Sequence, residues 1–315
     1  MKTLVSIILA LILAAATGLP VSAQVAGRAI ISPVPIYPRE GKIPEAWKDN
    51  FVFLDPAAGE VVVSYPDEQQ PGMRVTLRFG RHDQVDPVIG SVVVRQSGGL
   101  YHYEYTVRNG ARARLEIKLW SLVVGSQDSQ LTGAHPTWRT SSAASPFSRP
   151  GSIRPEVVVT WSAGARNMHL PKGLAIGGFR VVSSYKPGLT LAYAQAAVES
   201  EYTEAAARTL PPAVAEQLSR IMSPDWDTAQ VMTVGPKFTT GDPKELIAMD
   251  FHRGLSQLAV TGALKADSPF VSSAISALIS HMQSPGSAGP PLDFLEKAAP
   301  GLETEVAVAM KLSLQ

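Results

Sequence analysis

The six histidines of the chain are its first candidates for metal binding or proton transfer, and they are widely spaced. A zinc site usually shows two histidines within one turn of a helix or loop, because ligands at that spacing can reach one ion. No two histidines here lie within ten residues of each other. The best local cluster is Arg81-His82-Asp83 with Asp86, and its place beside Pro87 is typical of a turn. The chain has no cysteine, which excludes thiol nucleophiles, Fe–S clusters and Cys-type zinc sites. With the histidines this far apart, we expect no metal and no cofactor.

Acidic and nucleophilic side chains give no clearer signal for catalysis. Asp225 and Asp227 have the alternating spacing of a calcium loop, but no further ligand series follows them. No Gly-x-Ser-x-Gly motif marks a serine nucleophile, and the paired acids of a glycoside hydrolase would meet only in three dimensions. The sequence therefore assigns no catalytic residue and favours a protein that is not an enzyme. A hydrolase whose active-site residues are dispersed along the chain stays open as an alternative.

The segment 126–154 has the residue types of a binding loop. Twelve of its 29 residues are Ser, Gly or Pro, and so long an irregular stretch inside a compact domain is either functional or mobile. Tryptophan and arginine are enriched at binding hot spots, because they combine apolar area with hydrogen bonding or charge. The candidate contact residues are Trp138, Arg139, Phe147 and Arg149. We expect them to contact an envelope protein or a polysaccharide; the alternative is a passive flap that Trp138 pins onto a sheet.

The elements that must hold this loop are β-strands. Three tyrosines alternate with polar residues from Tyr101 to Tyr105, and Asn109-Gly110 is the pair best suited to a tight turn with positive φ. They predict a hairpin over 100–122, whose tyrosines are either buried or form a stacking platform for sugars or bases. Further strand-like runs lie at 51–54, 60–65, 74–79, 156–161, 176–183 and 189–196. No crossover helix separates these runs, so we expect antiparallel sheets over 24–197.

After residue 197 the hydrophobic period becomes helical. Asp242-Pro243-Lys244-Glu245 predicts a helix start with the aspartate as N-cap. Apolar stripes over 243–264 and 269–282 predict two one-sided helices that pack face to face, since such helices are marginal in water alone. The expected organisation of this part is a helical module at 198–283, a Ser/Pro/Gly-rich linker at 284–291 and a C-terminal segment at 292–315.

The first residues, 1–23, have the layout of a secretory signal peptide. A positive start precedes an apolar run from Leu4 to Ala16, which is followed by Gly18, Pro20 and small residues before Ala23. The run is shorter than the ~20 residues that a membrane span needs. We therefore expect cleavage after Ala23 and a secreted or periplasmic protein with no later membrane span; an uncleaved N-terminal anchor is the alternative.

Composition limits the partners further. Hydrophobic residues make up 45% of the 315 and charged residues 17%, which suits a packed globular chain rather than a disordered one. The formal net charge of +1 leaves no basic field to hold nucleic acid. The sequence carries no signal for the oligomeric state.

One strand motif resembles a known fold. Tyr101-x-Tyr103-x-Tyr105-x-Val107-x-Asn109 is similar to the mid-sheet strand of immunoglobulin-like modules in uncharacterised exported bacterial proteins. The similarity continues through Val159-Thr160-Trp161 and Gly177-Gly178-Phe179 and covers about residues 90–197. It implies an antiparallel immunoglobulin-like β-sandwich, followed here by the C-terminal helical module, and it implies no catalytic residues.

The expected function is that of an exported, non-catalytic structural or binding protein of the periplasm or cell envelope. The segment 126–154 would make its contacts. A carbohydrate-binding module, with exposed Trp and Tyr in a row across one sheet, is an alternative beside the hydrolase.

Overall fold

The computed structural model describes residues 52–125, 130–133, 135–144, 157–199, 201–222, 227–283 and 293–314. The chain divides into two compact units: unit 1 comprises Met1–Phe79 and Tyr202–Ile221, and unit 2 comprises Gly80–Glu201 and Met222–Gln315. The predicted signal peptide at 1–23 and the predicted linker at 284–291 lie outside the described residues.

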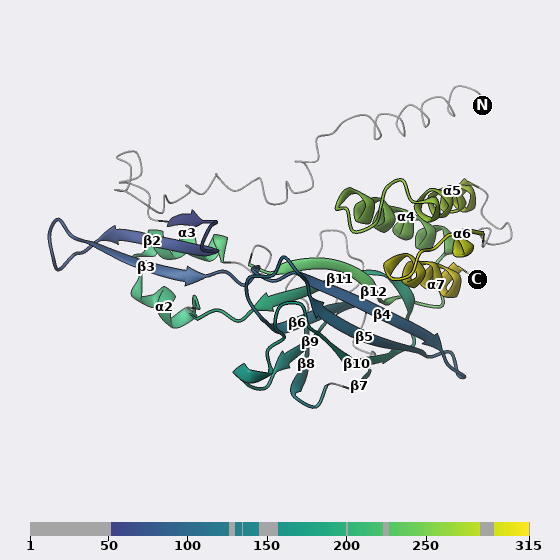
Figure 1. The fold of residues 1–315 in the computed structure, drawn as a ribbon, viewed down its shortest axis with the longest axis horizontal. Coiled ribbons are helices and arrows are strands. Elements are labelled where there is room, and N and C mark those ends of the chain that lie inside the picture. The colour runs from purple at the N-terminus through teal and green to yellow at the C-terminus, as the bar shows by residue number, and fades with distance from the viewer. Residues whose placement is uncertain are drawn as a thin grey trace, which may run out of the picture. The chain divides into compact units, whose positions relative to one another are not determined.

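Unit 1 is a small antiparallel sheet with two helices (Figure 1). The strands, in the order β1-β2-β3, and the helices are β1 Val52–Asp55, β2 Glu60–Pro66, β3 Arg74–Gly80, α2 Glu204–Thr209 and α3 Pro212–Ile221. The β1-β2 turn forms because the buried Asp55 carboxylate accepts from the N–H groups of Ala57 and Ala58 at 3.1 and 3.0 Å. The face of α3 that buries Val214 and Leu218 completes this small core, since α3 contacts β1 and β2.

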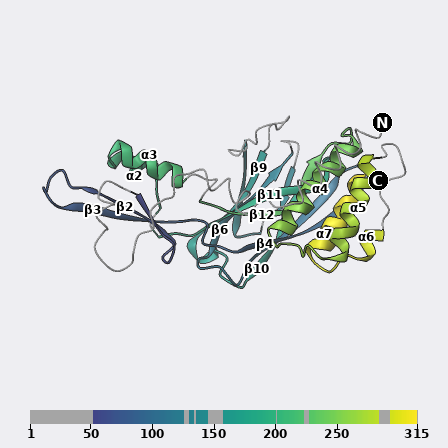
Figure 2. The same ribbon diagram turned by 90° about the horizontal axis from the view of Figure 1, so that it is seen from above.

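Unit 2 contains two antiparallel sheets (Figures 1 and 2). The four-stranded sheet, in the order β4-β5-β10-β7, consists of β4 Pro87–Arg95, β5 Tyr101–Asn109, β7 Gln130–Gly133 and β10 Ala175–Ser183. The five-stranded sheet, in the order β12-β11-β6-β9-β8, consists of β6 Ile117–Val124, β8 Trp138–Ala144, β9 Val157–Ala163, β11 Lys186–Ala196 and β12 Ala229–Phe238. A 3-10 helix, Arg166–Met168, lies between β9 and β10. Every described strand pair is antiparallel, which confirms that expectation.

The two sheets of unit 2 share one aromatic core. The three tyrosines from Tyr101 to Tyr105 are buried on one face of β5, which confirms the predicted alternation. On the five-stranded sheet, the rings of Trp120 and Trp161 stack with their centroids 4.2 Å apart. Phe179 of β10 lies edge-on to Trp120 at 5.1 Å between centroids. Rings of this size interlock at native packing density, so the core holds the two sheets against each other.

The predicted hairpin over 100–122 is wrong, because β5 and β6 belong to different sheets. β5 pairs with β4 and β10, whereas β6 pairs with β11 and β9. The Asn109-Gly110 pair has no positive φ. The fully buried Asn109 amide instead accepts from the N–H of Asp86 at 3.1 Å and donates to the carbonyls of Leu115 and Leu170 at 2.8 and 3.2 Å. A pair that usually makes a tight turn here bridges three segments inside the protein.

The C-terminal part of unit 2 ends in four helices, which gather beside the sheets (Figure 2). They are α4 Lys244–Val260, α5 Pro269–Gln283, α6 Asp293–Glu296 and α7 Leu302–Leu314. The expected packing of the two striped helices is confirmed, since α4 contacts α5 and buried Phe251, Leu255 and Leu278 share one core. Among the helices of the described residues, none is long and apolar enough to cross a membrane.

The segment 198–283, predicted as a helical module, differs from that prediction in two features. The strand β12 pairs along its length with β11 and completes the five-stranded sheet, and α2 and α3 belong to unit 1. Gly235 and Pro236 lie inside β12, and because glycine and proline are rare in strands, this strand is not recognisable from the sequence. Proline is tolerated there because β12 is a terminal strand of its sheet.

The predicted N-cap of α4 is also wrong. The helix begins at Lys244, and Pro243 occupies the cap position with no side-chain cap bond. The Asp242 carboxylate instead accepts from the N–H of Thr239 at 2.6 Å, so it closes the turn between β12 and α4.

Candidate functional site

The predicted contact segment 126–154 is not a single irregular loop, because it contains β7 and β8. Trp138, at the start of β8, is only 4% exposed, and its ring lies edge-on to Phe179 with the centroids 5.5 Å apart. Arg139 follows it with an exposed side chain, while Phe147 and Arg149 lie outside the described residues. Trp138 is therefore an anchor of β8 in the core, and any contact with a partner would fall to exposed neighbours such as Arg139.

β7 and β8 are the terminal strands of the two sheets on one side of unit 2. The backbone of an edge strand alternates between groups bonded to its neighbour and groups directed away from it. Just before β8, the Thr137 carbonyl accepts from the N–H of Gly164 at 2.9 Å. With the β8-β9 register, this bond places the backbone N–H and C=O groups of Thr140 and Ser142 on the side away from β9. Of the described strands, β9 alone pairs with β8.

The side chains along this edge are small. Ser141, Ser142 and Ala143 are exposed, and Arg139 is the one charged residue of β8. Natural edge strands are usually protected by lysines, prolines or bulges that discourage pairing with another chain. Apart from Arg139, β8 carries none of these protections in its sequence.

The terminal strands on the other side of unit 2 are β4 and β12, and side chains close that edge. The Thr233 hydroxyl of β12 donates to the carbonyl of Ile89 on β4 at 3.3 Å. The Glu305 carboxylate of α7 accepts from the N–H and the hydroxyl of Ser91 at 3.0 and 2.9 Å. The outward carbonyl of Ile89 and the outward N–H of Ser91 thus have partners inside unit 2.

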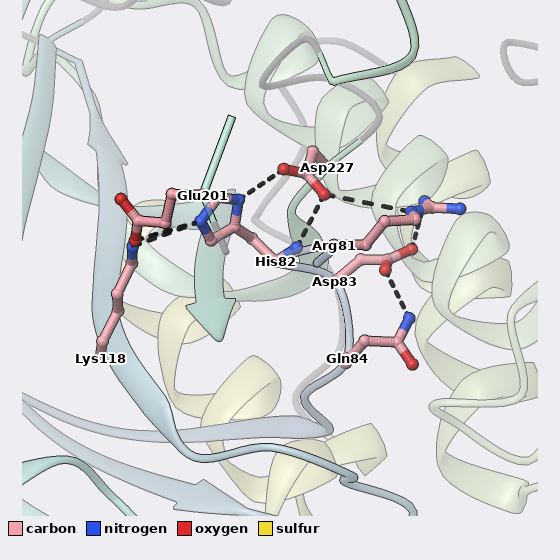
Figure 3. A network of polar contacts seen from close by, with 7 residues as sticks. All are labelled: Arg81, His82, Asp83, Gln84, Lys118, Glu201 and Asp227. Carbon is pink, nitrogen blue, oxygen red and sulfur yellow. Dashed lines mark hydrogen bonds and ion pairs between the residues drawn. The ribbon is translucent and has the colours of Figure 1, made fainter. Parts of the chain in front are cut away.

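A polar network in unit 2 joins residues that are far apart in the sequence (Figure 3). The Asp227 carboxylate accepts from the backbone N–H of His82 at 2.7 Å and lies 2.5 Å from its ring Nδ1. On the other side of the ring, Nε2 lies 3.3 Å from Lys118 Nζ and 3.6 Å from Glu201 Oε1. Lys118 forms an ion pair with Glu201, and this hydrogen bond holds the pKa of the Glu201 carboxyl below its usual range.

The network fixes the orientation of the His82 ring. Since the Asp227 carboxylate is almost fully buried and can only accept, the His82 ring donates to it from Nδ1, and in that tautomer Nε2 accepts from Lys118. This geometry resembles the base and its orienting acid in a catalytic triad, but Nε2 faces an ammonium and a carboxylate instead of a nucleophile. No group of three or more His, Cys, Asp or Glu that could hold a metal ion occurs within the described ranges.

The position of the network gives it a structural role. The chain passes between the units after Phe79, after Glu201 and after Ile221. His82 lies three residues after the first of these passages, Glu201 is the last residue before the second, and Asp227 lies six residues after the third. The network therefore ties together, within unit 2, the three segments that lead to and from unit 1. Sequence reasoning assigned His82 to a turn and Asp227 to an incomplete calcium loop, and nothing local in either sequence points to the other.

The aromatic residues of the sheets are core residues. Tyr103 donates from its buried hydroxyl to the carbonyl of Tyr185 at 2.6 Å, which joins β5 to the β10-β11 connection. The tryptophans of β6, β8 and β9 are buried as well. A row of exposed rings, which the carbohydrate-binding alternative requires, is not present on the described parts of either sheet; Trp47 and Trp226 lie outside them.

No protein-family model and no curated protein matches the chain. Among solved structures, it is similar to an uncharacterised protein from Nocardia farcinica whose crystal structure reveals an immunoglobulin-like fold. The sequences are 10% identical, the TM-score is 0.23, and the similarity covers 48% of this chain and 98% of that chain. Similarity at this level does not establish a shared fold. The fold class of this chain rests on its own strand pairing and helices: it is a mixed β and α protein with antiparallel sheets.

Proposed function

We propose that this chain is an exported, non-catalytic binding protein of the periplasm or cell envelope and that it contacts its partner through the segment 126–154. The observation that carries the proposal is the edge of β8, whose outward backbone groups at Thr140 and Ser142 have no strand partner among the described residues. An edge of this kind is a template for pairing with another chain.

In the proposed contact, an extended segment of an envelope protein adds a strand to β8. Its backbone would bond to the N–H and C=O groups of Thr140 and Ser142, while the small exposed side chains of Ser141 and Ala143 allow close approach. The exposed guanidinium of Arg139 would pair with an acidic side chain of the added strand. Trp138 supports the contact indirectly, because its burial holds β8 in place.

We further propose that the two sheets of unit 2 form an immunoglobulin-like sandwich followed by a helical module. Support comes from the strand neighbours: β4-β5-β10 in one sheet and β12-β11-β6 in the other follow the A-B-E and G-F-C order of such sandwiches. The strands β7, β8 and β9 then extend the sandwich on the side where the contact is proposed.

Export is proposed from the signal-like segment 1–23. The measurement is an intact mass of the protein recovered from the exported fraction. A mass that begins at Gln24 supports cleavage after Ala23, and a mass of the full 315 residues in that fraction contradicts it.

The contact is tested by photo-crosslinking in cells, with a photoreactive side chain at the exposed Ala143 position. We expect a covalent adduct with one envelope protein. Ser142→Pro should abolish the adduct, because proline removes an outward N–H while an edge strand tolerates it. Ser142→Ala keeps the N–H and is the matched control, so its adduct should persist.

Two outcomes would contradict strand addition at β8. The first is an adduct that Ser142→Pro leaves unchanged. The second is the binding of a polysaccharide instead, which has no strand to add; that binding would survive Ser142→Pro and fall with Arg139→Ala.

A further inference from the structure

A pocket of about 430 Å³ lies between β4 and α7 in unit 2. Its walls are largely apolar and include Val92, Val93, Ala298, Pro300 and Val308. Pockets of this size fall in the range that takes small molecules. Val92 of β4 lines this pocket and is 62% exposed. The pocket is therefore continuous with exposed apolar surface on β4.

Glu305 also lines this pocket, and no cation among the described residues pairs with its carboxylate. Its Oε2 atom accepts both hydrogen bonds from Ser91. Its Oε1 atom accepts no bond, and no Lys, Arg or His nitrogen lies within 4.0 Å of the carboxylate, among the residues that the structure describes. Burial raises the pKa of Glu305 although the Ser91 donors oppose this. Burial, and after it the charge of Glu305, raises the pKa of the Tyr105 hydroxyl.

Capping the edge of β4 does not by itself require a charge at this position. A glutamine would accept equally well from the N–H and hydroxyl of Ser91 through its amide oxygen, without the free-energy cost of a partly buried carboxylate. The position of Glu305 in the first turns of α7 offsets part of that cost through the helix dipole. The remaining cost would be offset by a cation that enters the pocket with an apolar body.

We propose that this pocket binds a small primary alkylammonium ligand. Its ammonium group would donate to Glu305 Oε1, and its alkyl chain would lie against Val92, Val93 and Val308. Charge complementarity selects the ammonium, because an alcohol leaves the carboxylate without a counter-charge and a carboxylate ligand adds a second negative charge. The apolar walls select the alkyl chain.

The test is calorimetric titration of the full chain at about pH 7.5 with hexylammonium, hexanol and hexanoate, which share one alkyl length. We expect hexylammonium to bind at least about tenfold more tightly than hexanol, with hexanoate weakest. Glu305→Gln should remove the preference for hexylammonium while retaining the bonds to Ser91. Glu104→Gln, which changes an exposed carboxylate on β5, is the matched control and should leave the preference unchanged.

Equal binding of hexylammonium and hexanol, no binding of either, or a preference that survives Glu305→Gln would overturn the proposal. If Glu305→Gln fails to fold, the pH dependence of binding to the unmodified chain still tests the proposal. As the pH falls through the raised pKa of Glu305, affinity for hexylammonium should fall while affinity for hexanol stays constant. A constant affinity for both ligands would contradict the assigned contact.

A further titration, with a blocked lysine as ligand, distinguishes a small ligand from the lysine side chain of a protein partner. The blocked lysine Nα-acetyl-lysine-methylamide carries the same ammonium on a shorter alkyl chain and should bind more weakly than hexylammonium. If it binds more tightly, with the same dependence on Glu305, the pocket accepts lysine side chains of a protein and the small-ligand proposal is wrong.

Discussion

The two sides of unit 2 treat their terminal strands differently. At the edge formed by β4 and β12, the Thr233 hydroxyl and the Glu305 carboxylate form hydrogen bonds with outward backbone groups of β4. The helix α7 lies against both strands. At β8, small side chains border outward groups that have no strand partner within the described part of the chain. One side of unit 2 is thus closed by side chains from distant elements, and on the other side β9 is the one described strand that pairs with β8.

The largest expected effect on stability is at the side of β4 and β12, because α4 and α7 pack together there. Leu258 of α4 is 2% exposed, and α4 contacts α7. Leu258→Asp would leave a cavity and bury an unpaired carboxylate, so we expect a loss of more than about 5 kcal/mol in the free energy of unfolding. Denaturant unfolding measures it. Met249→Asp, at an exposed position of the same helix, should change stability by less than about 0.5 kcal/mol; equal effects of the two changes would mean that the stripe on α4 is not buried.

The second-largest expected effect on stability is at the side of β8. Trp138→Ala removes a buried ring from the aromatic core and should cost about 3–5 kcal/mol in the free energy of unfolding. Arg139→Ala, one residue later and exposed, should change stability by less than about 0.5 kcal/mol. Thermal unfolding followed by circular dichroism compares them. A neutral Trp138→Ala would show that β8 is not anchored by this ring.

The smallest expected effect on stability comes from Glu305, where two substitutions distinguish the hydrogen bonds to Ser91 from the negative charge. Glu305→Leu would leave the N–H and hydroxyl of Ser91 without their acceptor and should cost about 1–3 kcal/mol in the free energy of unfolding. Glu305→Gln keeps an acceptor and should cost less than Glu305→Leu. Equal losses would show that capping does not stabilise this edge.

The pH dependence of the same variants follows from the raised pKa of Glu305. The folded chain holds this proton at a pH where the unfolded chain has released it, so the stability of the parent relative to Glu305→Gln falls as pH rises through the raised pKa. Unfolding measured from about pH 4 to 8 checks the sign, and a difference that grows with pH in favour of the parent would contradict it.

The sequence predicted elements whose signal is local. The tyrosine alternation of β5 and the apolar stripes of α4 and α5 appear where expected, because burial of one face imposes a period that can be read in a short window. The Asn109-Gly110 pair misled the prediction, because the Asn109 side chain binds Asp86, Leu115 and Leu170 in three dimensions. Turn chemistry is a local preference, and tertiary hydrogen bonds override it.

The candidate site could be predicted only in part. The segment 126–154 was identified by composition, but its serines and alanines gave no strand signal, since small residues have low β-propensity and β8 depends on pairing with β9. The contact between His82 and Asp227 spans 145 positions, and no spacing rule connects such residues. Glu305 is inconspicuous in the sequence because the cause of its raised pKa is the burial created by packing α7 on β4.

The contact between His82 and Asp227 also has a consequence for the order of folding. Adjacent strands such as β4 and β5 are joined by a short turn and can pair as soon as both are made, whereas this contact closes a loop of 145 residues. Loop closure costs entropy that grows with the logarithm of loop length, and contacts at long range form slowly. The two segments of unit 1 are separated by the residues of unit 2 from Gly80 to Glu201. We therefore expect refolding in which the pairing of β4 with β5 precedes the completion of unit 1.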